Sequence, residues 1–409
     1  MKIGVIPENP LDRVALLAGM VPTPLAQTIM GMWLARTIMV GVKVGVFEAL
    51  KDGPLTAPEV AARCQTDPRA TAKLLFALAG SDYLRVKAPP KRHSSGLPHA
   101  ASANQLAVAA KVVANTGVNA AADAAADAAP APKGQCAEPP ATATPDAWYA
   151  LAPVARRWLL ASSPQSLRDG ILHQFLDAQM IEHYEDFVVT GRPVDMHATM
   201  SPEQWGVYQR GMRSGANLYA PEVARRTPVP KGARDMLDIG GAHGYFSVAL
   251  CRRHPGLRAT ILDLPQAVAQ SAPLLAQEGM GDRVTHWAGD ALTADLGVAA
   301  YDLIFISSLL HHFDAPTCLA LCGRAACALR PGGYLVVQEV FRPASARAAG
   351  QLGALSDLYF AVTSEAGTWS TAEIAAWERT VGLRPRKPIN FLFAPGTGQQ
   401  SARKPRKPV

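Results

Sequence analysis

Residues 235–247 read DMLDIGGAHGYFS, and this stretch decides the expected fold. A short apolar strand around Leu237 runs into a glycine-rich turn, and a helix is expected to begin near Tyr245. Gly240, Gly241 and Gly244 allow a tight turn and let the backbone lie close to a ligand. This order of strand, turn and helix is typical of ligand-binding α/β folds.

The carboxylate of Asp238 stands directly ahead of these glycines and indicates the charge of the ligand. A loop built for a pyrophosphate should not carry an anion there, because like charges at close range repel. The spacing also departs from the dinucleotide fingerprint G-x-G-x-x-G, which requires glycine where Ala242 stands. The stretch favours a nucleoside with a positive end and no phosphate. S-adenosylmethionine, with its sulfonium and ammonium groups, fits.

Composition predicts two or three globular domains, because the chain has 409 residues of which 49% are apolar. The net charge of +7 arises at one end of the sequence. Residues 384–409 carry seven cations and no acid, so residues 1–383 are formally neutral. We expect a basic, Pro-rich tail at residues 396–409 that is solvated and flexible, and no nucleic-acid partner.

The cysteines and the apolar segments indicate a cytoplasmic protein. No C-x-x-C pair or zinc pattern occurs, so we expect free thiols in a reducing compartment and no metal. Prolines and charges break up the first residues, so no export signal is expected. Charged side chains such as Arg36 and Lys43 interrupt the apolar residues 25–50, so a buried helix pair at an interface is expected rather than a membrane span. The cysteines are Cys64, Cys136, Cys251, Cys318, Cys322 and Cys327.

The first half of the chain is expected to form a helical domain from residues 1–85 and 148–195. Thr56 and Glu59 form a capping box for one helix, and Asp67 caps the next. Residues 83–86 and 148–151 read as two paired strands, the wing of a winged helix. Residues 86–147 between them are rich in Ala and Pro and lack aromatic side chains. We expect this insertion to be disordered.

From Asp235 the pattern changes to alternating strands and helices. Strands are expected at residues 235–239, 258–263, 284–288, 301–307 and 334–339, with a further candidate at 389–393. This alternation predicts an α/β domain at residues 196–395, with a doubly wound, mostly parallel, Rossmann-like sheet covered on both faces.

Polar side chains fall at the carboxyl ends of four of these strands, where such sheets bind ligands. Asp238 ends the first strand, and Asp263 ends the second at a position that suits a carboxylate gripping ribose hydroxyls. Asp290 follows the third strand, where it can accept a hydrogen bond from an adenine amino group or cap a helix. His311 follows the fourth strand. His243 in the glycine loop is expected to be incidental.

These motifs resemble those of bacterial and plant small-molecule O-methyltransferases that use S-adenosylmethionine, a group that includes acetylserotonin, caffeate and antibiotic-pathway enzymes. The family's glycine motif matches residues 237–244, with Ala242 in place of the usual middle glycine. Its D-L-P matches residues 263–265, and its L-R-P-G-G loop matches residues 329–333. Residues 52–80 resemble the family's winged-helix dimerisation domain. The resemblance covers nearly everything except residues 86–147 and the tail.

The resemblance implies a class I methyltransferase, an S-adenosylmethionine cofactor, a small-molecule hydroxyl acceptor and a homodimer formed through the N-terminal domain. Tyr208 and Met212 match an aromatic-x-x-x-Met contact of the family and are the best candidates to line the acceptor pocket. Met180, Trp205, Phe341, Leu358, Tyr359 and Trp369 are further candidates for that lining. The implied cofactor contacts are Asp238, Gly240, Gly241, Gly244, Asp263, Leu264, Gly289, Asp290, Ala291, Ser307, Tyr208 and Met212.

The resemblance also implies a histidine general base in residues 310–313, LHHF. His311 holds the family's position, and His312 is the alternative. Glu339 matches the family's first supporting carboxylate, whereas the second is absent from residues 367–371. What orients His311 is therefore an open question at this point.

Three other functions stay open from the residues. Methylation at carbon or nitrogen, or a relative that does not methylate, would use the same fold. An NAD(P)-dependent oxidoreductase is disfavoured by Asp238 and by the glycine spacing. A transcription regulator is disfavoured because the presumed recognition helix, residues 67–79, carries only Arg69 and Lys73 as cations.

Overall fold

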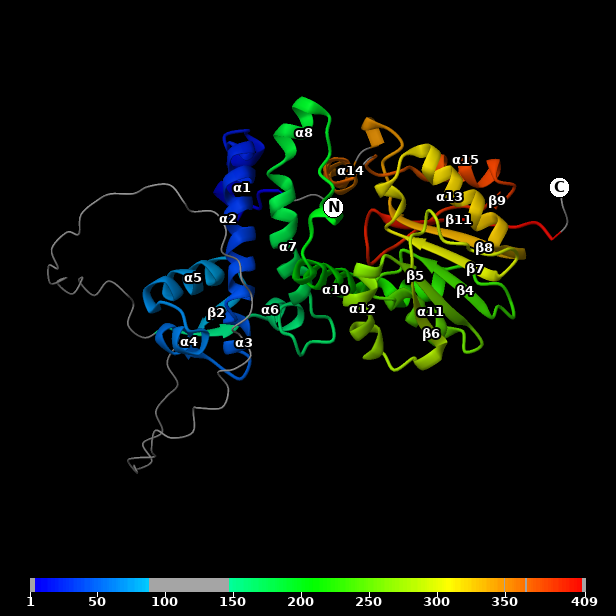
Figure 1. Ribbon diagram of the computed structural model, residues 1–409. Coiled ribbons are helices and arrows are strands. Elements are labelled where there is room, and N and C mark those ends of the chain that lie inside the picture. The colour runs from blue at the N-terminus through cyan, green and yellow to red at the C-terminus, as the bar shows by residue number, and fades with distance from the viewer. Residues whose placement is uncertain (1–3, 88–146, 349, 365, 407–409) are drawn as a thin grey trace, which may run out of the picture.

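The computed structural model describes residues 4–87, 147–348, 350–364 and 366–406, which form a helical part and a sheet-containing part (Figure 1). Helix α10 (Pro202–Arg226) joins them, because it packs on α7 (Arg168–Ile181) and on two helices of the sheet-containing part. All but the two ends of the insertion expected at residues 86–147 lie outside the described residues.

The helical part has a small core that surrounds a three-stranded sheet. Strand β3 pairs with β1 and with β2, both antiparallel, and the pairing of Val86 with Tyr149 forms the expected wing. Thr56 and Glu59 make the expected capping box of α4. Val46, Phe47, Leu50, Leu75 and Leu78 are among the fully buried core side chains. The elements are α1 (Pro10–Leu17), α2 (Thr23–Lys43), α3 (Val46–Ala49), β1 (Leu55–Thr56), α4 (Ala57–Cys64), α5 (Pro68–Gly80), β2 (Leu84–Lys87), β3 (Trp148–Leu151), α6 (Pro153–Trp158), α8 (Tyr184–Thr190) and α9 (Met196–Thr199).

Helix α2 is long and apolar enough, by length and composition alone, to cross a membrane, and among the described residues it is the only such helix. Core helices of globular proteins pass the same test, so a single helix of this kind is a weak indication. Only 17% of its apolar window is buried within the chain, which leaves an apolar face without a partner.

The sheet-containing part has the predicted doubly wound topology. Five parallel strands lie in the order β6-β5-β4-β7-β8, and the antiparallel strands β11 and β10 follow beyond β8. The chain moves outward from β4 to β5 and β6, then returns to place β7 on the other side of β4. Doubly wound folds bind ligands where the strand order reverses in this way, here at the carboxyl ends of β4 and β7. The strands are β4 (Asp235–Ile239), β5 (Arg258–Asp263), β6 (Val284–Ala288), β7 (Tyr301–Ser307), β8 (Leu329–Val340), β9 (Arg384–Pro385), β10 (Ile389–Asn390) and β11 (Thr397–Arg403).

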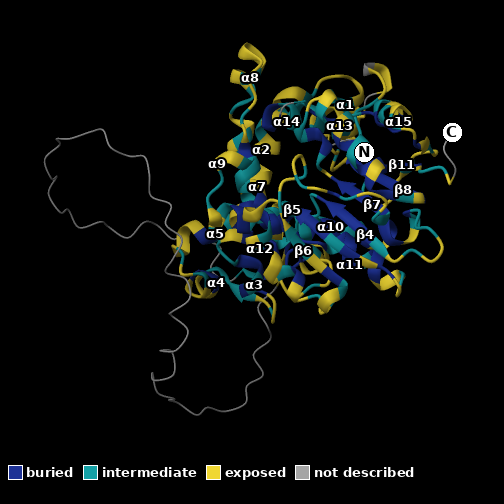
Figure 2. Ribbon diagram, turned by 45° about the vertical axis from the view of Figure 1, so that its right-hand side comes forward, coloured by how far each residue is buried: buried dark blue, intermediate teal, exposed yellow. Residues whose placement is uncertain are grey.

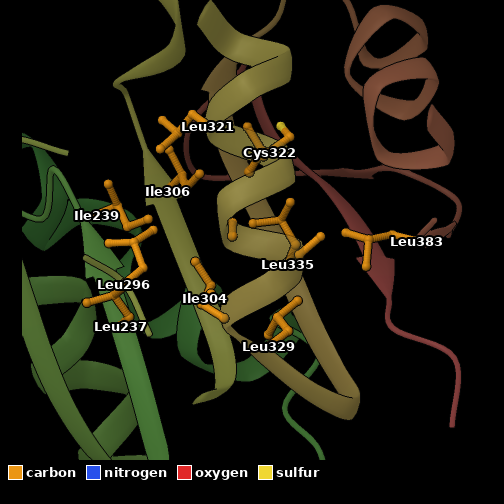
Figure 3. Close-up of a cluster of buried hydrophobic side chains, with 14 of the residues drawn as sticks. Leu237, Ile239, Leu296, Ile304, Ile306, Leu321, Cys322, Leu329, Leu335 and Leu383 are labelled. Atoms are coloured by element: carbon orange, nitrogen blue, oxygen red, sulfur yellow. The ribbon is translucent and has the colours of Figure 1, made fainter. Parts of the chain in front are cut away.

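Successive side chains of a strand point to opposite faces of the sheet. Both faces are buried here, because each packs against helices. Leu237, Ile304 and Leu335 lie on one face and pack against Leu321 and Cys322 of α13 (Figure 3). The other face is covered by α10, α11 and α12. Figure 2 shows the strands as the most deeply buried elements. The helices of this part are α11 (Tyr245–Arg253), α12 (Pro265–Ala276), α13 (Ala315–Ala328), α14 (Gln351–Thr363) and α15 (Thr371–Thr380), and the short 3-10 helices are η1 (Gly281–Arg283), η2 (Leu310–His312) and η3 (Ala346–Ala348).

The expectation of a solvated tail from residue 396 is wrong for residues 397–403. These residues form β11, which pairs with β8 along seven residues, from Thr397 opposite Val340 to Arg403 opposite Tyr334. Gln399 and Gln400 are buried because both side chains find hydrogen-bond partners inside the domain. The strand expected at 389–393 is present only as the two-residue strand β10, which pairs with β11.

Candidate active site

A buried carboxylate lies near the end of β4, directly before the glycine loop. Asp238 is 1% exposed, and its Oδ2 accepts a hydrogen bond of 2.6 Å from the Ser247 hydroxyl on α11. Its Oδ1 is buried without a partner. A Cβ atom at Gly241 would lie 2.5 Å from the carboxyl carbon of Asp238, so only glycine fits there. Burial raises the pKa of Asp238 to about 7, although the Ser247 hydrogen bond opposes that shift.

The second acidic residue is tied to the same loop. Asp263 ends β5, and its carboxylate accepts hydrogen bonds from the backbone N–H groups of Ala242 (2.7 Å) and Leu264 (2.8 Å). Burial raises the pKa of Asp263, and these two bonds oppose the shift. Ala242 has a φ of 48°, a left-handed conformation that explains why glycine is usual there. His286 on β6 donates to the Ala242 carbonyl at 2.8 Å, a contact with no signal in the sequence.

The remaining predicted cofactor residues lie nearby but are engaged in the fold. Asp290 is exposed, and its carboxylate accepts from the backbone N–H of Leu292 at 2.8 Å. The Ser307 hydroxyl at the end of β7 accepts from Gln338 at 3.0 Å. Gly289 donates its N–H to the Asp263 carbonyl, and the Ala291 carbonyl accepts from Arg324. His243 is buried and accepts from the Tyr245 N–H, a structural role.

His311 and Glu339 form a buried pair at the carboxyl ends of β7 and β8. The Nδ1 atom of His311 lies 3.0 Å from Oε2 of Glu339, and both side chains are at most 4% exposed. Oε1 of Glu339 accepts from the N–H groups of Leu309 (2.8 Å) and Leu310 (2.9 Å). The glutamate therefore fixes both the imidazole and the short helix η2 that carries it. A neutral His311 that donates from Nδ1 presents a lone pair at Nε2.

Neighbouring rings hold His311 in place where a second carboxylate is missing. The ring of Phe360 on α14 lies 4.0 Å from that of His311, centroid to centroid. The Ser364 hydroxyl donates to the His311 carbonyl at 2.7 Å, and the Trp369 indole N–H donates to the Leu310 carbonyl at 3.0 Å. Packing and backbone contacts therefore orient the imidazole together with Glu339.

The alternative base, His312, faces a different environment. Its ring lies 4.2 Å from His311 and 4.7 Å from His197, centroid to centroid. Burial, together with these two imidazoles, lowers the pKa of His312 well below its ordinary value. Burial also lowers the pKa of His197 to about 4. His197 lies on α9 and was not identified from the sequence.

Tyr208 on α10 lies where the predicted cofactor and acceptor regions meet. Its ring contacts His197 at 5.3 Å and His173 at 5.4 Å, both edge to face. Burial raises the pKa of Tyr208, and the negative charges of Asp263, Asp177 and Glu339 raise it further. The ring of Tyr208 therefore contacts residues of both α7 and α9.

The other proposed lining residues divide into two groups. Trp369 and Phe341 pack against the hydrophobic core beside the sheet and are structural in part. Tyr359 on α14 donates from its hydroxyl to Asp177 on α7 at 2.6 Å. Asp177 and its neighbour His173 were missed from the sequence, because nothing in their own helix indicates the partner residue on α14. Met180, Met212, Trp205 and Leu358 are buried or half-buried.

The carboxylates at these strand ends fit a cationic nucleoside. Asp238 offers a buried oxygen without a partner, and Asp263 adds a second carboxylate at the same loop. The close approach at Gly241 keeps the surface of the loop free of side chains. Two carboxylates at close range attract positive charge and repel phosphate.

Two family models match this chain, and both describe O-methyltransferases. A family model described as the O-methyltransferase domain matches residues 169–383, and one described as the O-methyltransferase dimerisation domain matches residues 26–118.

Individual relatives span nearly the whole chain. A 3-hydroxy-5-methyl-1-naphthoate 3-O-methyltransferase of Streptomyces sahachiroi is 24% identical over 92% of this chain and 93% of its own length. A mitomycin biosynthesis 6-O-methyltransferase of Streptomyces lavendulae is 27% identical over 95% of this chain and 96% of its own length. The structure of human N-acetylserotonin methyltransferase in complex with SAM superposes with a TM-score of 0.72 at 17% identity, covering 97% of this chain and 99% of that one.

Proposed function

This chain belongs to the O-methyltransferase family, and on that basis we propose that it methylates a hydroxyl of a small aromatic natural product with His311 as general base. The observation that carries the proposal is the buried His311–Glu339 pair, 3.0 Å apart, at the edge of the sheet that also holds the glycine loop. Family membership sets aside the oxidoreductase and the transcription regulator.

The family uses S-adenosylmethionine, which supplies an electrophilic methyl group on a sulfonium when bound. The chain provides two carboxylates for it. We assign Asp238, with its unpartnered Oδ1, to the cationic end of the cofactor. Asp263, at the end of the neighbouring strand, is assigned to the ribose. A side chain at Gly241 would clash with Asp238, so glycine at this position lets the assigned carboxylate keep its place.

His311 removes the proton that the acceptor hydroxyl loses as its oxygen forms the new bond to the methyl carbon, which would leave the cofactor's sulfur and its bonding electron pair behind as S-adenosylhomocysteine. A phenol is ordinarily a much weaker acid than an imidazolium, so a histidine base accepts this proton only as the new bond forms. The proton ends on Nε2 of His311, and Glu339 stabilises the imidazolium through Nδ1. A positioned base typically contributes about 10²–10⁴-fold to the rate.

His311 is preferred over His312 because of their partners. His311 contacts a buried carboxylate, which stabilises the protonated ring. His312 faces two other imidazoles, and they destabilise its protonated form. A base must accept a proton in the transition state, so the arrangement favours His311.

An aromatic acceptor is supported by the rings around the base. The rings of Phe360 and His312 contact that of His311 directly. His197 in turn contacts His312, and Tyr208 contacts His197. The relatives named for a naphthoate and for mitomycin biosynthesis are consistent with a ring-containing natural product. Flat apolar walls with a few polar groups suit such a substrate.

We also propose that the working form is a homodimer. The matched dimerisation domain includes α2, whose Met30, Trp33 and Leu34 are 60%, 64% and 41% exposed. Residues at this spacing share one face of a helix. An apolar face of this kind is typical of a subunit interface.

The base assignment is tested by replacing each histidine in turn. We expect His311→Ala to lower kcat by at least 10²-fold or so, while affinity for S-adenosylhomocysteine, measured by calorimetry, stays within about twofold. His312→Ala is the matched control and is expected to keep more than about a tenth of the turnover, because the base is retained. Mass spectrometry of products from phenolic and polyketide hydroxyls identifies the acceptor. Near wild-type turnover by His311→Ala would remove it from this role.

A further inference from the structure

We propose that His173, oriented by Asp177, determines acceptor specificity by accepting a hydrogen bond from a second donor group on the acceptor, such as a hydroxyl or an N–H. This inference rests on the proposed function, because it concerns the substrate that His311 deprotonates. None of the residues involved belongs to the cofactor loop or to the proposed base pair.

The cluster around Asp177 joins two helices that are far apart in the sequence. Asp177 on α7 accepts from the Tyr359 hydroxyl on α14 at 2.6 Å and from Gln174 at 2.8 Å. Its Oδ2 also lies 3.4 Å from Nδ1 of His173, one turn earlier on the same helix. Figure 1 shows α7 and α14 side by side, between the helical part and the sheet.

His173 is held rigidly by close packing. A Cβ atom at Gly211 on α10 would lie 2.5 Å from Cβ of His173, so the two helices approach closely at this point. The side chain of His173 is 6% exposed, and its ring meets that of Tyr208 edge to face at 5.4 Å. Burial lowers the pKa of His173, so the ring is neutral near pH 7, although the Asp177 charge opposes this shift.

The orientation of His173 leaves one nitrogen unsatisfied. With Nδ1 protonated toward Asp177, Nε2 carries a lone pair and can only accept a hydrogen bond. In the structure Nε2 is buried and has no partner. A buried acceptor without a partner is unfavourable, and a donor group on the bound acceptor would satisfy it.

Two series of contacts connect this cluster to the proposed base. One runs from Asp177 through Tyr359 to Phe360, whose rings are 5.5 Å apart, and then to His311 at 4.0 Å. The other runs from His173 through Tyr208 and on to the imidazoles beside His311. Ring contacts therefore connect the imidazole of His173 with that of His311, the proposed base. On this inference, an acceptor whose hydroxyl lies at His311 would direct its far end toward α7.

The charges in the cluster define the chemistry of that far end. A lone pair at Nε2 and the carboxylate of Asp177 both favour a hydrogen-bond donor. A carboxylate on the acceptor would meet like charge at Asp177, which is 15% exposed, and would find no donor at Nε2. We therefore expect acceptors that carry a second hydroxyl or N–H to be preferred over acceptors that carry a carboxylate.

Three naphthalenes with one hydroxyl in common test this preference. The probes are a naphthol, the dihydroxynaphthalene with a second hydroxyl at the far ring position, and the hydroxynaphthoate with a carboxylate at that same position. Binding is measured by calorimetry on the full chain saturated with S-adenosylhomocysteine, and kcat/KM is measured with S-adenosylmethionine. We expect the wild type to favour the dihydroxynaphthalene over the naphthol by about 10-fold, as one hydrogen bond supplies.

Two variants and a control on the same helix isolate the cluster. His173→Leu should remove the preference by weakening only the dihydroxynaphthalene. Asp177→Asn should abolish or reverse it, because an amide can donate to Nδ1 and move the ring proton to Nε2. Gln179→Ala, at an exposed position of α7, should leave it unchanged.

A preference that survives in His173→Leu overturns the inference, as does a wild type that binds the hydroxynaphthoate most tightly. Failure of all three probes to bind also overturns it. If S-adenosylhomocysteine still binds in that case, the cofactor part of the proposed function stands. If His311→Ala turns over the naphthol normally, the base assignment fails while the preference of His173 is still measurable.

Discussion

Single carboxylates at the sheet edge have pKa values that the fold sets and that a ligand can change. Asp238 is the clearest case, because burial raises its pKa to about 7 and one of its oxygens lacks a partner. A bound cation supplies that partner and favours the ionised form. Binding of the cofactor and deprotonation of Asp238 are therefore expected to be linked.

The affinity for S-adenosylhomocysteine, which keeps the ammonium group, should increase as pH rises from 6 to 8. Below the pKa of about 7 the carboxyl is neutral, and the loss approaches about tenfold for each pH unit. Calorimetric titrations across this range measure the effect. Asp238→Asn should bind weakly with a flat profile. Ser247→Ala removes a hydrogen bond that lowers this pKa, so its profile should move to higher pH. A flat profile for the wild type would contradict the assignment.

The sequence alone predicted which of the candidate site residues lie at strand ends. Asp238, Asp263 and Glu339 occupy strand ends, and parallel strands bring such ends to one edge. His173 and Asp177 were not identifiable in this way. Their significance depends on Tyr359, almost two hundred residues later, and on an unpartnered nitrogen that only the packing of α7 against α10 reveals.

Among the elements, strand β11 shows the limit of pattern reading most clearly. Its sequence TGQQSAR is polar and basic, which is typical of a solvated end. The structure buries it because its partners come from distant segments. Gln399 donates to Gln338 and to Thr227, and Gln400 donates to Glu378 on α15. By contrast, β4 to β7 were predicted with correct bounds, because parallel strands covered on both faces form short apolar runs.

The contact between α15 and β11 predicts that the protein loses stability as pH rises. Burial raises the pKa of Glu378 to about 8 from an ordinary 4.5, so the folded state holds a proton that the unfolded state releases. This contribution is complete below the unfolded pKa and is lost as pH rises through about 8. Urea unfolding should show roughly 2 kcal/mol less stability at pH 8 than at pH 6 from this group.

Glu378→Gln is the matched variant for that measurement, because it stays neutral at every pH. The difference between wild type and variant should change sign or shrink across the window, while groups common to both cancel. An equal pH slope in both proteins would show that Glu378 titrates normally in the fold.

At the scale of the whole molecule, the helical part carries both the residues proposed to bind the acceptor and the proposed surface for a second subunit. Helix α7 directs His173 and Asp177 toward the catalytic part, while Arg36 and Lys43 of α2 lie over the ring of Phe175 on the same helix. Helix α2, which carries the proposed interface, therefore packs against α7, the helix that carries the proposed acceptor residues.

Replacing Trp33 by Glu should convert the proposed dimer into monomers. Trp33 is 64% exposed on the apolar face of α2, and a buried charge there would be unpaired. Light scattering after size exclusion measures the mass. Val298→Glu is the control, because Val298 is 83% exposed in the loop between β6 and β7 and should leave the mass unchanged. A dimer of the Trp33 variant would place the interface elsewhere.

The position of β11 also has a consequence for the order of events during synthesis. β8 is made well before β11, and nothing else among the described strands pairs with its outer edge. Until residues 397–403 leave the ribosome, the edge of the nascent sheet beside Glu339, which pairs with Gly398, is unprotected. A chain that ends before β11 is thus open to pairing with other chains through this edge.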